Sequence, residues 1–395
     1  MKSIIKILIA LMAFLFVMAG CEYDVAEPQW TKEHQDPPVP VISEVDPPGG
    51  AVAGVNTVTI MGENFSDTME KNHVYFDNME AEILESSSGM IRVRRPDIVN
   101  DSSTVTVVSY DALLAAKFSP YRVDDVVEHY GNFLENDALS ALAMDKDENL
   151  YVVFTTDPRN IYKVTPDGDK TIIGSIAGAN VSGAKIAPNG NLILIVNDEE
   201  ILQIDMAGGA DTTTVWAEVD KRVKYGDFDE YGNFYTGSRR TDLIVVKTDL
   251  SSEGIGVYAR DEIFDVRVFD GYVYVLVESD AFYIYRHQIL DADGNVGDQE
   301  PVLDWAETGE FADSEPLTFT FDENGTLYVG TDNEYAILSV SDEGMDIFYK
   351  GIIPGPAKQL LWGNGHYLYM IWDDAQEETV LRIDMGVNGA PYYGR

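Results

Sequence analysis

The chain has 395 residues, 45% of them hydrophobic, which is enough for two or three domains with large cores. Its 68 acidic and 27 basic residues give a net charge of −41, and a field of that sign repels nucleic acid and anionic lipid headgroups, so we expect no nucleic-acid partner. The single cysteine excludes an internal disulfide, so stability has to come from packed cores.

The amino terminus has the layout of a secretory signal. Two lysines precede residues 7–18, an apolar run too short to cross a bilayer, which takes about 20 residues. Cys21 follows Met18-Ala19-Gly20, and this sequence resembles the lipobox of bacterial lipoproteins. The resemblance implies a signal peptide over residues 1–20, a lipid on Cys21 and attachment to a membrane through that lipid. The alternative is an uncleaved anchor with an incidental cysteine.

Residues 21–40 are polar and contain several prolines, without apolar periodicity, which is typical of a flexible tether. Glu22 and Asp24, just behind the cysteine, resemble the export signals of surface lipoproteins in glycan-foraging bacteria. That resemblance implies an outer-membrane lipoprotein exposed at the cell surface. A periplasm-facing anchor is the alternative.

Residues 41–124 consist of short alternating runs separated by turns, a pattern that predicts an immunoglobulin-like β-sandwich. The clearest strands are expected at 57–60, 74–76, 90–93 and 104–108.

The same segment resembles the IPT/TIG family of immunoglobulin-like domains. The matching residues are Ile42-Ser43-Glu44-Val45-Asp46-Pro47, Gly54, Val58-Thr59-Ile60-Met61-Gly62-Glu63-Asn64-Phe65, Val74-Tyr75-Phe76 and Arg95-Pro96. Gly62 and Asn64 suit a turn with unusual backbone angles, and Phe65 would fill the sandwich interior. The resemblance implies interaction or spacing, and we expect a spacer.

Residues 125–395 contain a repeat of about 40 residues. Each copy has an apolar strand, a turn related to Asp-x-x-Gly-Asn and a second strand. The second strands are aligned at Leu150, Leu192, Phe234, Val273, Leu327 and Leu368. A third strand follows in every copy and a fourth in the first five, for example at 171–173, 215–216, 255–257 and 346–348. Four strands per repeat predict the blades of a β-propeller, and the repeat resembles NHL-type propellers.

The sixth copy lacks a fourth strand, because the chain ends soon after Ile383. Residues 126–130, ahead of the first copy, have the character of a spare outer strand. Pairing the two would close the ring and remove open sheet edges. We therefore predict an all-β chain, an immunoglobulin-like sandwich plus a six-bladed β-propeller closed by an N-terminal outer strand.

Propeller ligands usually meet the face that carries the loops between second and third strands. Every such loop here contains a carboxylate, with arginines and a tryptophan interspersed, a combination that suits stacking on a sugar and hydrogen bonds to its hydroxyls. The candidate ligand-binding residues are Arg159, Arg239, Arg240, Asp242, Asp280, Tyr335, Trp372 and Asp373. The alternative is that these loops only share the acidity of the whole chain.

Signals for metal binding and catalysis are weak. Asp291, Asp293 and Asn295 alternate like the start of a calcium loop, but Val296 stands where a glycine is expected, so a simple turn is favoured over a Ca²⁺ site. The five histidines show no metal-ligand spacing, and no Ser-His-Asp signature is visible. We therefore assign no catalytic residues and expect no cofactor.

Three hypotheses for function remain. The leading one is a surface-exposed binding lipoprotein whose propeller face recognises a partner protein or a ligand such as a glycan of an uptake system. The second is a structural subunit of an outer-membrane or extracellular assembly. The third is a calcium-dependent, lactonase- or hydrolase-like enzyme. The aromatic tail with Tyr392 and Tyr393 either packs over the ring closure or docks into a partner.

Overall fold

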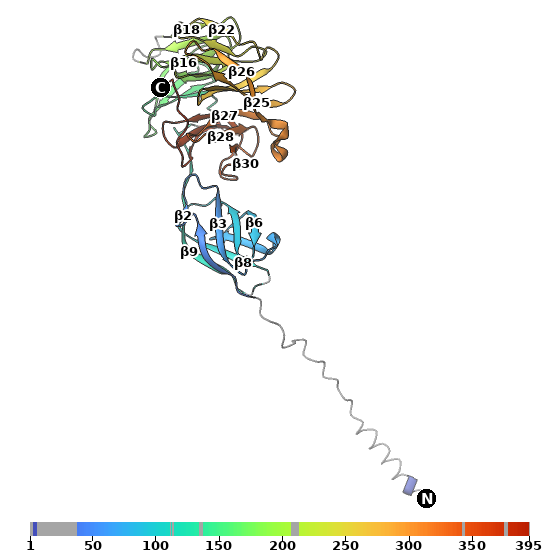
Figure 1. Ribbon diagram of the computed structural model, residues 1–395. Coiled ribbons are helices and arrows are strands. Elements are labelled where there is room, and N and C mark those ends of the chain that lie inside the picture. The colour runs from blue at the N-terminus through green and yellow to red at the C-terminus, as the bar shows by residue number, and fades with distance from the viewer. Residues whose placement is uncertain are drawn as a thin grey trace.

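The computed structural model describes residues 3–5, 38–110, 112, 114–133, 137–206, 213–341, 344–374 and 378–394. Cys21, most of the expected signal 1–20 and most of the expected tether 21–40 lie outside these residues. Within the described ranges no helix is long and apolar enough to cross a membrane. The fold is almost entirely β, with a small sandwich at the rim of a larger ring of sheets (Figure 1).

The sandwich consists of two mainly antiparallel sheets packed face to face. The first has the order β1 (Val41–Asp46), β3 (Thr57–Glu63), β7 (Met90–Arg94) and β6 (Ile83–Ser87). The second has the order β2 (Gly50–Ala51), β9 (Ala116–Val123), β8 (Asn100–Ser109), β4 (Asn72–Phe76) and β5 (Met79–Ala81), with the short 3₁₀ helix η1 (Met69–Lys71) before β4. All four strands predicted from the alternating runs are present.

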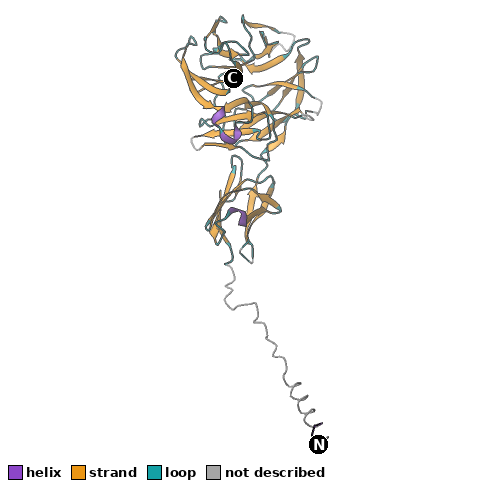
Figure 2. Cartoon of the chain, turned by 90° about the vertical axis from the view of Figure 1, so that its right-hand side faces the viewer, coloured by secondary structure: helices purple, strands orange, loops and turns teal. Residues whose placement is uncertain are grey.

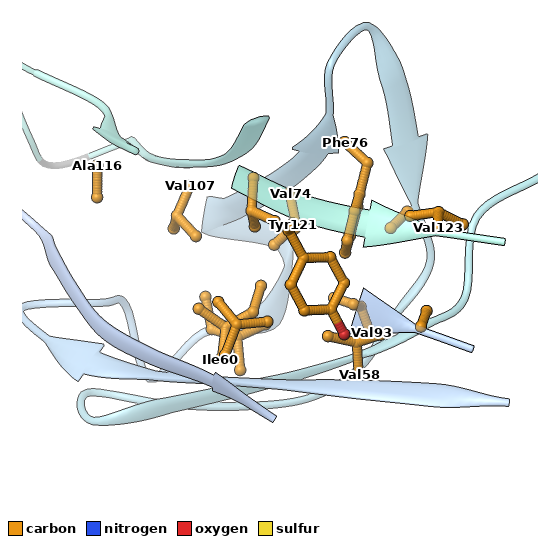
Figure 3. Packing of buried hydrophobic residues seen from close by; sticks show 14 of the residues in the cluster. Val58, Ile60, Val74, Phe76, Val93, Val107, Ala116, Tyr121 and Val123 are labelled. Atoms are coloured by element: carbon orange, nitrogen blue, oxygen red, sulfur yellow. The ribbon is translucent and has the colours of Figure 1, made fainter. Parts of the chain in front are cut away.

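Alternation along these strands builds the sandwich core. Val58 and Ile60 of β3 are fully buried, and so are Val74 and Phe76 of β4, because successive side chains of a strand point to opposite faces. Figure 3 shows Tyr121 between the two sheets, and its ring meets Phe76 edge-on at 5.8 Å. This aromatic pair fills the space between the sheets.

The rest of the described chain forms six four-stranded antiparallel sheets arranged as a β-propeller (Figure 2). We number them as blades in chain order. Blade one consists of β11 (Leu139–Met144), β12 (Leu150–Phe154), β13 (Asn160–Val164) and β14 (Lys170–Ser175). Blade two consists of β15 (Val181–Ile186), β16 (Leu192–Val196), β17 (Glu200–Ile204) and β18 (Thr214–Glu218). Blade three consists of β19 (Tyr225–Phe228), β20 (Phe234–Gly237), β21 (Ile244–Val246) and β22 (Ser252–Gly254).

Blades four and five follow the same order from the ring centre outward. Blade four consists of β23 (Glu262–Phe269), β24 (Tyr272–Glu278), β25 (Phe282–Ile289) and β26 (Val296–Asp304). Blade five consists of β27 (Pro316–Phe321), β28 (Leu327–Thr331), β29 (Ile337–Ser341) and β30 (Gly344–Ile347). Between them lie the 3₁₀ helices η3 (Trp305–Glu307) and η4 (Gly309–Phe311), which together with the long β25–β26 hairpin account for the extra length of this repeat.

Blade six confirms the predicted closure. Its order is β31 (Ala357–Trp362), β32 (Tyr367–Asp373), β33 (Glu378–Asp384) and β10 (Val127–His129), so the outer strand comes from the chain upstream of blade one. The register pairs Val127 with Ile383 and His129 with Leu381. The Tyr130 N–H extends the ladder by donating to the Val380 carbonyl at 2.8 Å.

The repeated turn is held by its first aspartate. In blade three the Asp229 carboxylate accepts the backbone N–H groups of Tyr231 and Asn233 at 3.0 and 2.8 Å and the hydroxyl of Tyr235 at 3.3 Å. Gly232 has φ 92°, a left-handed conformation that favours glycine. The motif recurs because one carboxylate satisfies the N–H groups that the turn leaves without sheet partners.

One predicted outer strand is displaced. Residues 255–257 were the expected fourth strand of blade three, whereas β22 covers Ser252–Gly254. Ile255 closes the strand with a bond from its N–H to the Leu243 carbonyl at 2.7 Å, and the chain then bends at Gly256, where φ is 85°. The apolar character of Ile255 and Val257 was therefore misleading.

The sandwich joins the ring at the outer edge of blades five and six, and Figure 2 shows the ring face-on with the sandwich beyond its rim. The Asp346 carboxylate accepts hydrogen bonds from Arg94 at 3.0 Å and from the Asn56 amide at 2.8 Å. The buried Tyr349 hydroxyl accepts the Gly54 N–H at 2.6 Å. Directional polar contacts of this kind fix the orientation of the two parts.

Ring closure can be tested at Tyr130, whose ring packs edge-on against Tyr369 at 5.2 Å and whose hydroxyl donates to the Thr165 carbonyl at 2.6 Å. Replacing a buried aromatic residue by alanine costs roughly 3–5 kcal/mol, so Tyr130→Ala should lower the unfolding free energy of the propeller by about that amount. Denaturant unfolding measures the change. Tyr231→Ala, at a ring 47% exposed, should leave stability nearly unchanged, and equal effects of both substitutions would contradict the closing role of this segment.

Candidate functional site

The centre of the ring holds a cavity of about 280 Å³. Most of its lining comes from the inner strands near their amino-terminal ends or from the residues just before those strands. The lining includes Leu139, Ser140, Val181, Ser182, Lys185, Lys224, Tyr225, Asp265, Arg267, Leu317, Thr318, Lys358 and Gln359, with Ile193, Ile195 and Phe234 from second strands. The volume is just below the usual range of small-molecule sites, so the cavity suits a compact ligand.

The carboxy-terminal tail lies across the opposite end of the ring, and Figure 2 shows the C-terminus at its middle. The Tyr392 hydroxyl donates to the Ile186 carbonyl at 2.7 Å, and the Ala390 N–H donates to the Phe321 carbonyl at 3.0 Å. Because these carbonyls belong to inner strands of blades two and five, the tail bridges the ring. Of the two alternatives for the tail, the structure thus shows it packed on the ring.

Two buried ion pairs form the floor of the cavity. Lys185 contacts Asp227 at 3.3 Å, and Arg267 contacts Asp265 at 2.9 Å. The Asp265 carboxylate also accepts the Thr318 hydroxyl at 2.7 Å. The Lys185–Asp227 pair thus links the inner strands of blades two and three, and the Thr318–Asp265 bond links those of blades four and five.

Both floor carboxylates also serve the backbone. Asp227 accepts the Val268 N–H at 2.9 Å, and Asp265 accepts the N–H groups of Val266 and Phe319 at 2.9 and 3.2 Å. A buried carboxylate needs several donors to compensate its lost hydration, and here inner-strand N–H groups supply them. Both carboxylates therefore have structural roles.

Lys185 is the most strongly perturbed base of the site. Burial, reinforced by repulsion from Arg267, lowers its pKa to about 8, although Asp227 and Asp265 oppose the shift. Its ammonium lies 5.2 Å from the centre of the Tyr392 ring, so the tail forms part of its surroundings.

Lys224 and Lys358 are the other two lysines of the cavity lining. Lys224 lies 5.0 Å from the centre of the Tyr225 ring, and burial opposes its charge, but Tyr225 and nearby acids raise its pKa overall. Lys358 contacts Glu378 at 2.6 Å and Asp373 at 3.0 Å and donates to the Leu139 carbonyl at 2.9 Å. Three acceptors thus occupy the Lys358 ammonium.

The structure does not gather the eight predicted ligand-binding residues into one surface. Arg239 and Arg240 line an outer hollow beside blade three with Lys221, and Arg239 contacts Glu262 at 3.3 Å. Trp372 of blade six lies across the ring from them, in a groove beside the sandwich.

Contacts within the protein engage the other predicted residues. Arg159 contacts Asp157 at 2.7 Å, and Asp280 accepts the Tyr283 hydroxyl at 3.1 Å. Tyr335 packs edge-on against Phe311, and Asp242 lies 3.9 Å from Lys221. Asp373 reaches the central cavity indirectly, through its contact with Lys358.

Sequence reasoning missed the basic side chains of the cavity. Lys185, Arg267 and Lys358 each interrupt an inner strand that is otherwise mostly apolar or small, and Lys224 stands just before one. The available signal was that Lys185 and Arg267 share one position of the repeat, and Lys224 and Lys358 share another. Inner-strand residues of all blades converge on the axis.

The weak calcium candidate is a copy of the repeated turn. Asp291 accepts the backbone N–H groups of Asp293 and Asn295 at 3.1 and 3.2 Å and the Asn295 amide at 2.9 Å. Gly294 accepts the Tyr235 hydroxyl of blade three at 3.2 Å, so the turn is a packing element. Over the described ranges, no group of three or more His, Cys, Asp or Glu residues could hold a metal ion.

Comparisons with known proteins bear on both parts of the chain. Residues 40–120 match the model of the IPT/TIG domain family. Among solved structures, an auxiliary nutrient binding protein from Bacteroides thetaiotaomicron is similar at TM-score 0.52 and 12% identity, covering 88% of this chain and 98% of that one. The calcium-binding protein regucalcin from Agrobacterium tumefaciens gives TM-score 0.52 and 15% identity, covering 66% and 95%. Curated protein sequences give no match. At these identities the structural likeness shows the fold alone.

The depressed pKa of Lys185 predicts a pH-dependent stability. Between about pH 8 and its ordinary pKa of 10.5, the unfolded chain binds a proton that the folded chain has released, so stability rises with pH. Compared with Lys185→Met, the wild type should gain about 2–3 kcal/mol of unfolding free energy between about pH 7.5 and pH 10.5. Urea unfolding of both proteins gives this difference, in which other titrations cancel. A difference that is constant with pH would show an unshifted lysine.

Proposed function

We propose that this chain is a cell-envelope binding lipoprotein that holds a small ligand in the central cavity of its propeller. A lipid on Cys21 attaches it to the outer membrane with the folded parts facing outward, and the sandwich acts as a spacer. The observation that carries the proposal is the cavity itself, where lysine, glutamine and serine side chains lie beside apolar ones at the ring centre.

One of the similar solved structures and the chemistry of the cavity floor support this proposal over the alternatives. A fold match over 88% of this chain is to a protein described as an auxiliary nutrient binding protein, so the combination of both parts occurs in a protein with a binding role. The floor acids of this chain are engaged by lysine, arginine and backbone donors, which leaves them poorly suited to act as metal ligands. That chemistry favours ligand capture over calcium-dependent hydrolysis.

Blocking the cavity tests where ligands bind. Ser182 is a half-buried lining residue of β15, and Ser182→Trp would place an indole in the cavity. Ligands detected with wild-type protein on a saccharide array, and then measured by calorimetry, should lose binding to this variant. Arg239→Ala, in the outer hollow, is the control and should bind normally. Retained binding by Ser182→Trp together with loss in Arg239→Ala would move the site to the outer loops.

Anchoring is tested at the single cysteine. Cys21→Ser removes the only thiol able to carry a thioether-linked lipid, so the protein should move from the membrane fraction to the soluble fraction and lose fatty-acid labelling. Protease treatment of intact cells distinguishes outward from periplasmic exposure of the wild type. Unchanged membrane association of Cys21→Ser would contradict the lipid anchor.

A further inference from the structure

Basic residues outnumber acidic ones in the lining of the cavity. Acidic residues outnumber basic ones 68 to 27 overall, whereas the cavity lining contains four bases, Lys185, Lys224, Arg267 and Lys358, and one acid, Asp265. At physiological salt the field of distant surface acids is screened within about 8 Å, so a ligand in the cavity responds mainly to the local charges. Carboxylates contact Lys185, Arg267 and Lys358, which leaves Lys224 as the lining base with no carboxylate of the described residues within 4.0 Å.

Two of these bases have donors left for a ligand. An ammonium has three N–H donors, and Lys185 uses one, on Asp227 at 3.3 Å. The Lys224 ammonium lies 5.0 Å from the centre of the Tyr225 ring, and no carboxylate of the described residues lies within 4.0 Å of that ammonium. By contrast, Lys358 has three acceptors, and Arg267 donates to Asp265 and to the carbonyls of Val266 and Leu360.

The acid of the lining already has hydrogen-bond donors from the protein. The Asp265 side chain is 4% exposed, and its two oxygens accept from Arg267, Thr318 and two backbone N–H groups. These bonds occupy the lone pairs of the Asp265 carboxylate. A ligand therefore meets ammonium groups, and partly buried ammonium donors are satisfied best by an anion.

The remaining walls suit a hydroxylated ligand. Gln359 uses its oxygen to accept the Leu142 N–H at 2.9 Å, which leaves its amide donors for the cavity. The hydroxyls of Ser140 and Ser182 donate to strand carbonyls and keep lone pairs as acceptors. Leu317 and Tyr225 line the cavity and are only partly buried, so their apolar surface can cover the C–H face of a sugar ring.

We infer that the ligand is an acidic saccharide of one or two units, whose carboxylate or sulfate group binds between Lys224 and Lys185. This inference rests on the proposed binding function and names its ligand class. Carboxylate and sulfate present the same charged oxygens to lysine, so the experiment separates them.

Binding of an anion is coupled to the proton on Lys185. Asp227 of β19, Asp265 and Arg267 of β23 and the Tyr392 ring of the tail surround this ammonium. Its pKa is about 8 in the free protein, and an anion beside it would raise that value. Affinity for an acidic ligand should therefore fall as pH rises above 8, with proton uptake on binding.

The test uses the soluble protein from residue 22 onward with both parts retained. Calorimetry measures affinity for glucuronate, galacturonate and galactose 6-sulfate, with glucose and galactose as neutral partners, at pH 7 and 9. Lys224→Met should weaken acidic-sugar binding about tenfold or more, because a charge-assisted hydrogen bond is lost, and Lys224→Arg should retain much of it. Lys221→Met is the matched control, since Lys221 lies three residues away and lines the outer hollow.

The inference is supported if the wild type binds acidic sugars more tightly than neutral ones and if this preference is lost in Lys224→Met and kept in Lys221→Met. The acidic sugar that binds more tightly then identifies the charged group as carboxylate or sulfate. Equal binding of neutral and acidic sugars, unaffected by Lys224→Met, overturns the acidic ligand and leaves the binding function standing. Failure of every sugar to bind wild type overturns the inference as well. In that case array ligands that are lost in Ser182→Trp would still uphold the binding function.

Discussion

A propeller blade cannot bury both of its apolar faces alone, and the last blade of this ring has no outer strand until residues 127–129 supply it. The pairing of β10 with β33 joins segments more than 250 residues apart and removes an open sheet edge. Every inner strand is then held at a fixed distance from the axis. The central cavity, its ionic floor and the position of the sandwich all depend on this closure.

The floor of the cavity shows how a fold can place charge where packing would favour apolar side chains. Lys185 and Arg267 are tolerated at the axis because Asp227 and Asp265 face them, and these acids are tolerated because inner-strand N–H groups and Thr318 satisfy their remaining lone pairs. Removing one member would leave a buried charge uncompensated, which is usually more costly than losing the whole set. The charged residues of the floor thus depend on one another for their stability.

Local rules explain what the sequence could predict. The turn motif is readable because the Asp229 carboxylate bonds to N–H groups two and four residues away, and the missing strand of blade six is readable from strand counts. The site is not local. Lys185 and Asp227 lie 42 residues apart, and Tyr392 reaches Ile186 across 206 residues, so only the assembled ring brings them together. Loop composition led instead to Trp372 and Arg239, which the ring separates.

The attachment of the sandwich to the rim has a geometric consequence. Because Asp346 and Tyr349 hold the sandwich at the outer edge of blades five and six, the axis of the ring runs across the length of the molecule (Figure 2). A molecule tethered at its amino-terminal end would direct the cavity mouth sideways, parallel to the supporting surface.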